Sequence, residues 1–305
     1  MQKRWLAPIL GALLISGVGY APGTYAATTQ EVTQQQQGLT LNANLMLADG
    51  KGFADEMVLL THGTLTHKER STYAALQKNL ANNGISSLAI NLSLGLDNRH
   101  GEYDCAVPHT HKHTDALNEI GYWMTWLQQQ GAEKVTLMGH SRGGNQTAWY
   151  AAERDSDQVA KVILIAPATG EQQSAKDYAD KAGKPLAPIL QQAQQMVEAG
   201  KGTQMLKDTY FIYCKDAQVS AAAFADYYTV KGQFDTPTLL KEIAKPTLVV
   251  IGTADDVVAD LPEKIAPLAD AGKINVISLE DADHFFLDFA NEDLAAAAAE
   301  FIRSE

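Results

Sequence analysis

The chain is poor in cysteine, with two in 305 residues. That number excludes a zinc ribbon with four cysteine ligands and a small scaffold held together by many disulfides. Basic residues are also scarce, because 24 Lys and Arg face 36 Asp and Glu, which gives a formal net charge of -12. Nucleic acid is bound through clustered Lys and Arg that contact phosphates, so we expect no nucleic-acid partner.

The sequence also lacks an apolar run of the roughly 20 residues that span a bilayer. The longest candidate, from Trp5 to Val18, is shorter and contains Pro8. It follows a basic start and is followed by small residues up to Ala26, which is the layout of a secretory signal peptide over residues 1–26. An uncleaved membrane anchor is the alternative. We therefore expect an exported protein, periplasmic or secreted, with no membrane association after the signal peptide is removed.

Export changes the interpretation of the two cysteines. In an oxidising compartment Cys105 and Cys214 can pair, whereas two buried thiols are the alternative. We predict the disulfide. In the chain-entropy model, closing a loop of around 100 residues stabilises a fold by about 4–5 kcal/mol.

Short apolar runs alternate with segments of helical periodicity along most of the chain. The apolar runs are residues 57–60, 85–94, 135–138, 162–165, 247–251 and 275–279. The helical segments are 68–82, 114–130, 145–154 and 286–302. Continuous apolar strands are buried on both faces, and their alternation with helices predicts a doubly wound, mostly parallel α/β sheet. An apolar–polar alternation over residues 38–49 predicts one more strand, half buried.

One stretch interrupts this alternation. Residues 170–240 are polar and helical in pattern, and they are far longer than the dozen or so residues that a parallel crossover needs. We expect a helical cap insertion at one end of the sheet, within a single domain over residues 27–305.

The sharpest motif is the G-x-S-x-G of Gly139-His140-Ser141-Arg142-Gly143. It follows the apolar run 135–138 and opens a helix, which is the setting that exposes a nucleophilic serine on a tight turn. Such a hydroxyl needs a base, and His284 follows the last strand. Asp255, just past the strand 247–251, is predicted to orient the imidazole, with Asp256 as the alternative acid. The order Ser, Asp, His is the one this strand–turn–helix motif is associated with.

An acyl-transfer site also needs backbone N–H groups that stabilise an oxyanion. One is expected from Arg142, the residue after the nucleophile. The other should come from the loop after an early strand, where His62-Gly63-Thr64 stands, and we assign it to Thr64.

Together these motifs resemble the α/β-hydrolase fold family, over residues 38–303. The resemblance is strongest to bacterial carboxylesterases and related serine hydrolases with a helical cap. It implies cleavage of a small-molecule carboxylic ester through an acyl-enzyme, with neither a metal nor an organic cofactor. Amide, peptide or thioester cleavage is the alternative, because the fold alone does not choose the bond. The sequence does not indicate an oligomeric state.

A histidine-rich loop has two interpretations. Residues 97–115 contain His100, His109, His111 and His113, and an extended His-x-His-x-His run places three imidazoles on one side. These three are candidate zinc or copper ligands, so a metal-binding or sensing protein is a different class of function. The other interpretation is a polar loop that shapes the mouth of the site. A Cys105–Cys214 disulfide would tie this loop to the insertion.

Overall fold

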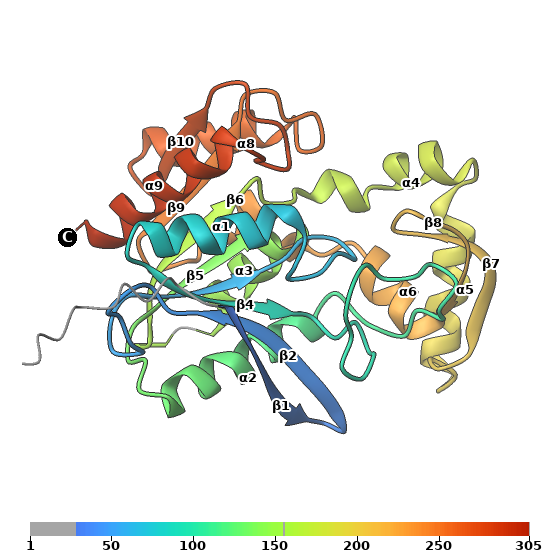
Figure 1. The fold of residues 1–305 in the computed structure, drawn as a ribbon. Helices are drawn as coiled ribbons and strands as arrows, with labels where there is room; N and C mark the ends of the chain where they lie inside the picture. The colour runs from blue at the N-terminus through green and yellow to red at the C-terminus, as the bar shows by residue number, and fades with distance from the viewer. Residues whose placement is uncertain (1–28, 155, 305) are drawn as a thin grey trace, which may run out of the picture.

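The computed structural model describes residues 29–154 and 156–304, so the predicted signal peptide, residues 1–26, lies outside the described residues. Its centre is an eight-stranded sheet in the order β1-β2-β4-β3-β5-β6-β9-β10 (Figure 1). The strands are β1 (Thr29–Gln36), β2 (Leu39–Met46), β3 (Met57–Thr61), β4 (Ser86–Asn91), β5 (Val135–His140), β6 (Val159–Ile165), β9 (Thr247–Gly252) and β10 (Asn275–Leu279).

The six strands from β4 to β10 across the sheet all run parallel. They are the six apolar runs of the sequence, so the predicted doubly wound, mostly parallel sheet is confirmed. β2 and β1 extend the sheet as an antiparallel hairpin beyond β4. The sequence pattern did not predict β1, because its residues are mostly Gln and Thr and most of them are exposed or half buried.

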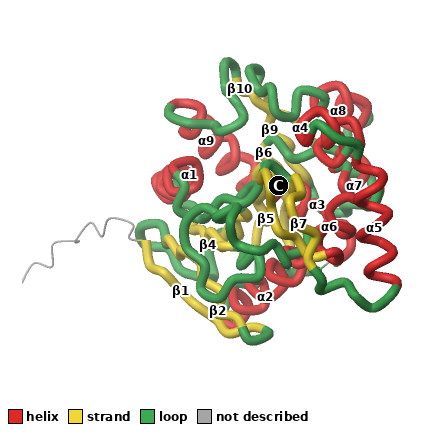
Figure 2. Tube along the Cα trace, turned by 90° about the vertical axis from the view of Figure 1, so that its right-hand side faces the viewer, coloured by secondary structure: helices red, strands yellow, loops and turns green. Residues whose placement is uncertain are grey.

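Helices cover both faces of the sheet (Figure 2). α1 (Ser71–Asn82) packs beside α9 (Phe289–Arg303) on one face, and α2 (Asp115–Gln129) packs beside α3 (Arg142–Glu153) on the other. α8 (Leu261–Asp270), which connects β9 to β10, was not predicted. In the part of the chain that is described, no helix is both long and apolar enough to cross a membrane.

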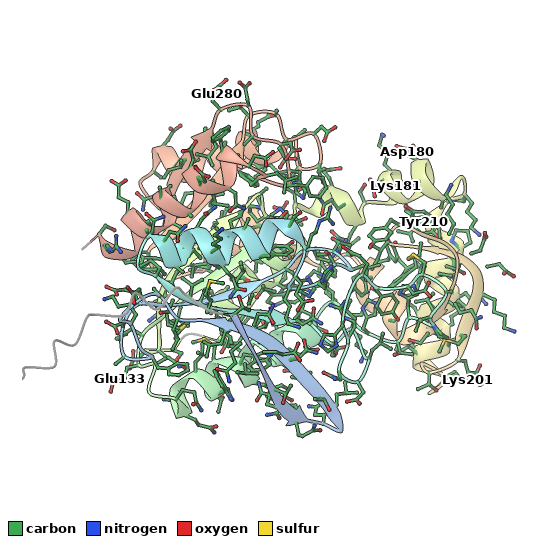
Figure 3. The ribbon with its side chains drawn as sticks, viewed as in Figure 1. Glu133, Asp180, Lys181, Lys201, Tyr210 and Glu280 are labelled. Atoms are coloured by element: carbon green, nitrogen blue, oxygen red, sulfur yellow. A yellow bond between two sulfur atoms is a disulfide. The ribbon has the colours of Figure 1, made fainter. Side chains whose placement is uncertain are left out.

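The segment between β6 and β9, which we call the inserted segment, lies to one side of the sheet (Figure 1). Its elements are η1 (Gly170–Gln173), α4 (Ala175–Ala182), α5 (Leu186–Glu198), β7 (Met205–Phe211), β8 (Cys214–Ser220), α6 (Ala221–Tyr228), η2 (Gly232–Phe234) and α7 (Thr236–Leu239). In Figure 3 the labels of Lys181 on α4 and Tyr210 on β7 show where this segment lies. Glu280, which follows β10, is labelled in another part of the molecule. The inserted segment contains the helices expected of a helical cap, but it also contains β7 and β8, which form an antiparallel hairpin with two register shifts.

The inserted segment is fastened to the loop that follows β4. Cys105 and Cys214 form a disulfide with their Cα atoms 5.4 Å apart. Beside it, the His109 N–H donates to the Gln218 carbonyl at 2.8 Å, and the His109 carbonyl accepts from the Ser220 N–H at 2.9 Å. The loop and the hairpin are therefore joined by one covalent bond and by backbone pairing.

We expect the disulfide to stabilise the fold by restricting the unfolded chain. The double variant Cys105→Ser/Cys214→Ser should lose about 2–5 kcal/mol of unfolding free energy, measured by urea denaturation without reductant. Reductant should destabilise the wild-type protein and leave the double variant unchanged. Superimposable curves for the oxidised wild type and the variant would contradict this role.

Candidate active site

Ser141 occupies a tight turn between β5 and α3. Its backbone has φ of 56° and ψ of -123°, a region that L-residues with a side chain rarely adopt. The turn is held by a hydrogen bond from the Ser141 N–H to the Ile165 carbonyl at 2.9 Å. It places the hydroxyl beyond the carboxyl end of β5, the edge where loops from parallel strands converge.

Two glycines of the motif permit this turn. A Cβ on Gly143 would lie 2.1 Å from the His62 carbonyl oxygen, and a Cβ on Gly139 would lie 2.5 Å from the Gly143 carbonyl oxygen. Both distances are impossible for a side chain, so the start of α3 can approach the loop after β3 only because glycine stands there.

The structure brings Ser141, His284 and Asp255 together in a chain of hydrogen bonds. His284 Nε2 lies 2.9 Å from the Ser141 hydroxyl oxygen, and His284 Nδ1 lies 2.8 Å from a carboxylate oxygen of Asp255. All three side chains come from loops at the carboxyl ends of β5, β9 and β10. The carboxylate oxygen accepts from Nδ1, which leaves Nε2 free to accept the hydroxyl proton of Ser141.

Asp255, rather than the alternative Asp256, faces the imidazole. Its other carboxylate oxygen accepts from the N–H groups of Val257 at 2.8 Å and Val258 at 3.1 Å. Burial alone would raise the pKa of Asp255, but the hydrogen bond and charge of His284 and these two N–H groups outweigh it and lower the pKa. Asp256 is exposed and lines the nearby pocket.

The loop after β3 lies directly beside the nucleophile. A Cβ built on Gly63 would lie 3.3 Å from the Cβ of Ser141, so Thr64, the next residue, borders the same space. Buried Arg99 anchors this loop by donating from Nη2 to the Thr66 carbonyl at 2.8 Å and to His62 Nε2 at 3.2 Å. The His62 ring is thus a structural anchor of the loop.

A second set of hydrogen bonds, which the sequence did not indicate, links the loop of Gly63 to the loop of His284. The Gly63 N–H donates to the Tyr73 hydroxyl at 2.8 Å, and that hydroxyl lies 2.8 Å from His140 Nδ1. His140 Nε2 lies 2.7 Å from the His284 carbonyl, which can only accept, so Nε2 carries the proton. Tyr73 therefore donates to Nδ1. Burial lowers the pKa of His140 to about 3, so the ring stays neutral.

A pocket of about 670 Å³ opens beside Ser141. Its walls combine loops of the sheet with the inserted segment, which contributes η1, α4 and the turn between β7 and β8. The lining from the inserted segment is Glu171, Gln172, Asp177, Lys181, Ile212 and Tyr213. The wall is mixed in character, with charged, aromatic and aliphatic side chains.

A family model described as serine aminopeptidase, S33, matches residues 53–292. The chain belongs to this family of α/β-hydrolases. No curated protein matches the chain significantly.

Solved structures show the same fold at low sequence identity. Est1E from Butyrivibrio proteoclasticus is 18% identical, with 89% of this chain and 97% of that chain covered and a TM-score of 0.63. The esterase domain of a Rhodothermus marinus protein is 17% identical, with 90% and 99% covered and a TM-score of 0.56. The Pyrococcus furiosus esterase Pf2001 is 15% identical, with 91% and 92% covered and a TM-score of 0.56.

The predicted histidine cluster of this hydrolase does not gather around a common point. His109 Nδ1 is 3.3 Å from His111 Nε2, whereas His113 Nε2 turns to the Asn145 side-chain oxygen at 2.9 Å. His100 is exposed and pairs with Glu31 at 2.9 Å. Over residues 29–154 and 156–304 no group of three His, Cys, Asp or Glu side chains is placed to hold a metal ion.

The three buried histidines instead pack the inserted segment against the sheet. His109 stacks on Tyr103 with ring centres 4.7 Å apart and meets Phe211 edge-on at 5.0 Å. Nδ1 of His111 lies 3.0 Å from the Tyr227 hydroxyl. Burial lowers the pKa of His109 to about 4 and that of His111 to about 3, and it holds the pKa of His113 well below the usual value.

These histidines make the fold sensitive to acid. Because they are neutral when folded and have a pKa near 6.5 when unfolded, the unfolded chain binds more protons below about pH 6.5. Their contribution to the free energy of unfolding is therefore fully present above that pH and is lost as the pH drops toward 4. Each such histidine should contribute a slope of about 1.4 kcal/mol per pH unit.

The variant His109→Phe removes one of these groups while keeping a ring between Tyr103 and Phe211. We expect its unfolding free energy, measured in urea at pH 7, 6 and 5, to fall less steeply than that of the wild type. Carboxylates titrate equally in both proteins, so the difference isolates the histidine. Parallel slopes would show that His109 is not held neutral by the fold.

Proposed function

We propose that the protein is a serine hydrolase that cleaves a carboxylic ester of a small molecule, with Ser141, His284 and Asp255 as a catalytic triad. The observation that supports it most is the position of His284, whose two ring nitrogens lie 2.9 Å from Ser141 and 2.8 Å from Asp255. Nucleophile and base at hydrogen-bond distance, with the base oriented by a third group, form the arrangement that activates a weak hydroxyl nucleophile.

In the first half-reaction, the Ser141 oxygen bonds to the ester carbonyl carbon while His284 Nε2 takes the hydroxyl proton. The carbonyl oxygen becomes an oxyanion, stabilised by the N–H groups of Thr64 and Arg142. The C–O bond to the alcohol then breaks, and the alcohol leaves with the proton from His284. In the second half-reaction, a water molecule attacks the carbonyl carbon of the acyl-enzyme while His284 Nε2 takes a proton from the water. The bond to the Ser141 oxygen then breaks, His284 returns the proton to that oxygen, and the acid product leaves.

The surroundings of His284 favour the imidazolium that forms in each half-reaction. Asp255 is held ionised by His284 and by two backbone N–H groups, so it supplies a full negative charge to Nδ1. Neutral His140 donates to the His284 carbonyl and holds the loop without adding a competing positive charge.

The pocket favours a compact substrate with polar groups over a long aliphatic chain. Its wall alternates Tyr213, Phe285 and Ile212 with charged side chains, among them the ion pair of Lys181 with Asp177 at 2.8 Å. One of the structures similar in fold is Est1E with ferulic acid bound. Ferulic acid is an aromatic acid, and a ligand of that kind suits a wall of this composition.

The S33 family model, described as a serine aminopeptidase, supports amide cleavage as the second candidate.

We further propose that the protein is exported. The disulfide between Cys105 and Cys214 forms readily in an oxidising compartment, and the leader-like residues 1–26 of the sequence fit that destination.

Replacing the nucleophile tests the proposal. Ser141→Ala should reduce hydrolysis of nitrophenyl esters by about 10⁴-fold or more, with an unchanged circular dichroism spectrum, because alanine lacks the hydroxyl that His284 Nε2 contacts. The wild type should be assayed on matched esters, thioesters and aminoacyl anilides, so that the preferred bond is identified in the same series. Undiminished turnover by Ser141→Ala would overturn the triad, and faster anilide than ester cleavage would favour the peptidase alternative.

A further inference from the structure

The Arg142 side chain carries a buried positive charge with an unusual set of partners. The residue is 7% exposed and lines the pocket beside Ser141. Its Nε donates to the Thr64 hydroxyl oxygen at 3.1 Å, and with the Gln173 amide oxygen turned toward it, Nη1 and Nη2 donate to that oxygen, Nη2 at 3.2 Å. The guanidinium carbon lies 5.5 Å from the centre of the Tyr227 ring.

None of these partners carries a negative charge. In the described residues, 29–154 and 156–304, no carboxylate forms an ion pair with Arg142, although other cations of the pocket wall do have one. Lys181 pairs with Asp177 at 2.8 Å, and Arg70 lies 3.7 Å from Glu102. The carboxylate of Asp177 acts on Arg142 through its charge, but it forms its ion pair with Lys181 and makes none with the guanidinium. A buried charge is normally paired, so a guanidinium without a bonded carboxylate beside a nucleophile is suited to a negative charge that develops during the reaction.

The Thr64 hydroxyl connects the Arg142 guanidinium to the pocket that contains Ser141. A threonine hydroxyl has one proton and two lone pairs, and here one lone pair accepts the Arg142 Nε–H. Within the described part of the chain no acceptor takes the hydroxyl proton. Thr64 lines the same pocket as Ser141, and Gly63 beside it would place a Cβ 3.3 Å from the Ser141 Cβ.

We infer that the Thr64 hydroxyl, held and polarised by the Arg142 guanidinium, donates a third hydrogen bond to the oxyanion. Thr64 then acts as a catalytic residue through its side chain as well as its N–H, and the Arg142 side chain is a positioning residue behind it. The inference rests on the proposed serine-hydrolase function. Because the oxyanion exists only after Ser141 has attacked, the bond strengthens in the transition state and raises kcat more than it tightens substrate binding.

The test compares two substitutions at Thr64 on the fastest nitrophenyl ester. Thr64→Val keeps the shape and the backbone N–H but removes the hydroxyl, and should lower kcat by about 100-fold with little change in KM. Thr64→Ser restores the hydroxyl and should recover most of kcat. The matched control is Thr147→Val on α3, because the Thr147 hydroxyl is also buried beside Gly139 of the motif but has no hydrogen-bond partner among the described residues. Its kcat should equal that of the wild type.

Arg142 variants test the link to the guanidinium. Arg142→Gln should lower kcat, Arg142→Lys should retain more of it, and Arg142→Gln should add little when combined with Thr64→Val, since both act on one bond. All variants should be compared at temperatures well below their measured Tm.

Three results would overturn the inference. They are full kcat in Thr64→Val, a Thr64→Ser variant as slow as Thr64→Val, and a loss in Arg142→Gln confined to esters whose acyl group carries a carboxylate. The last would assign Arg142 to substrate charge instead. Each of these leaves the triad intact, whereas an active Ser141→Ala variant would remove the proposed function itself.

Discussion

The close approach of the first turn of α3 to the loop after β3 is the contact on which the rest of the site depends. Gly143 leaves no room for a side chain against the His62 carbonyl, so the two backbones meet directly. That contact sets Thr64 beside Ser141 and directs the first N–H groups of α3 toward the same space, where a helix N-terminus favours negative charge. This arrangement requires a positive φ at Ser141, a backbone conformation that costs about 1–3 kcal/mol.

Around this contact, the buried polar groups divide into those that stay neutral and those that carry charge. Tyr73 and His140 are neutral, and each has a fixed donor and acceptor direction, so they hold two loops without altering the charge at His284. Asp255 and Arg142 are charged. Asp255 bonds to the His284 ring and Arg142 bonds to the Thr64 hydroxyl, so in the proposed mechanism each supports one of the two charges that an attacking serine creates.

Much of this could be predicted from the sequence, because continuous apolar runs and a glycine-flanked serine are local signals. They located the parallel strands and the serine–aspartate–histidine set at strand ends. β1 escaped prediction because it is stabilised by pairing with β2 and by the ion pair of Glu31 with buried Lys68 at 2.9 Å, not by apolar burial. The inserted hairpin escaped because its register shifts break the alternation that marks a strand.

Contacts between residues that are far apart in the sequence could not be predicted from local sequence patterns. Tyr73 shows only the spacing of a helical core position, yet its hydroxyl meets a ring 67 residues away. The His-x-His-x-His run suggested a metal site because alternation describes the backbone, whereas the partners of each ring are decided by the inserted segment that packs over them. The same holds for Arg142, whose partners Thr64 and Gln173 come from two other loops.

The claim that Ser141 is the activated nucleophile is tested most directly by a fluorophosphonate. An activated serine oxygen attacks its phosphorus atom, fluoride leaves, and the protein keeps a covalent phosphonyl ester. The account predicts one label per chain, located by mass spectrometry on the peptide that contains Ser141, absent in Ser141→Ala and much slower to form in His284→Gln. A label on another residue, or a label that persists in Ser141→Ala, would contradict it.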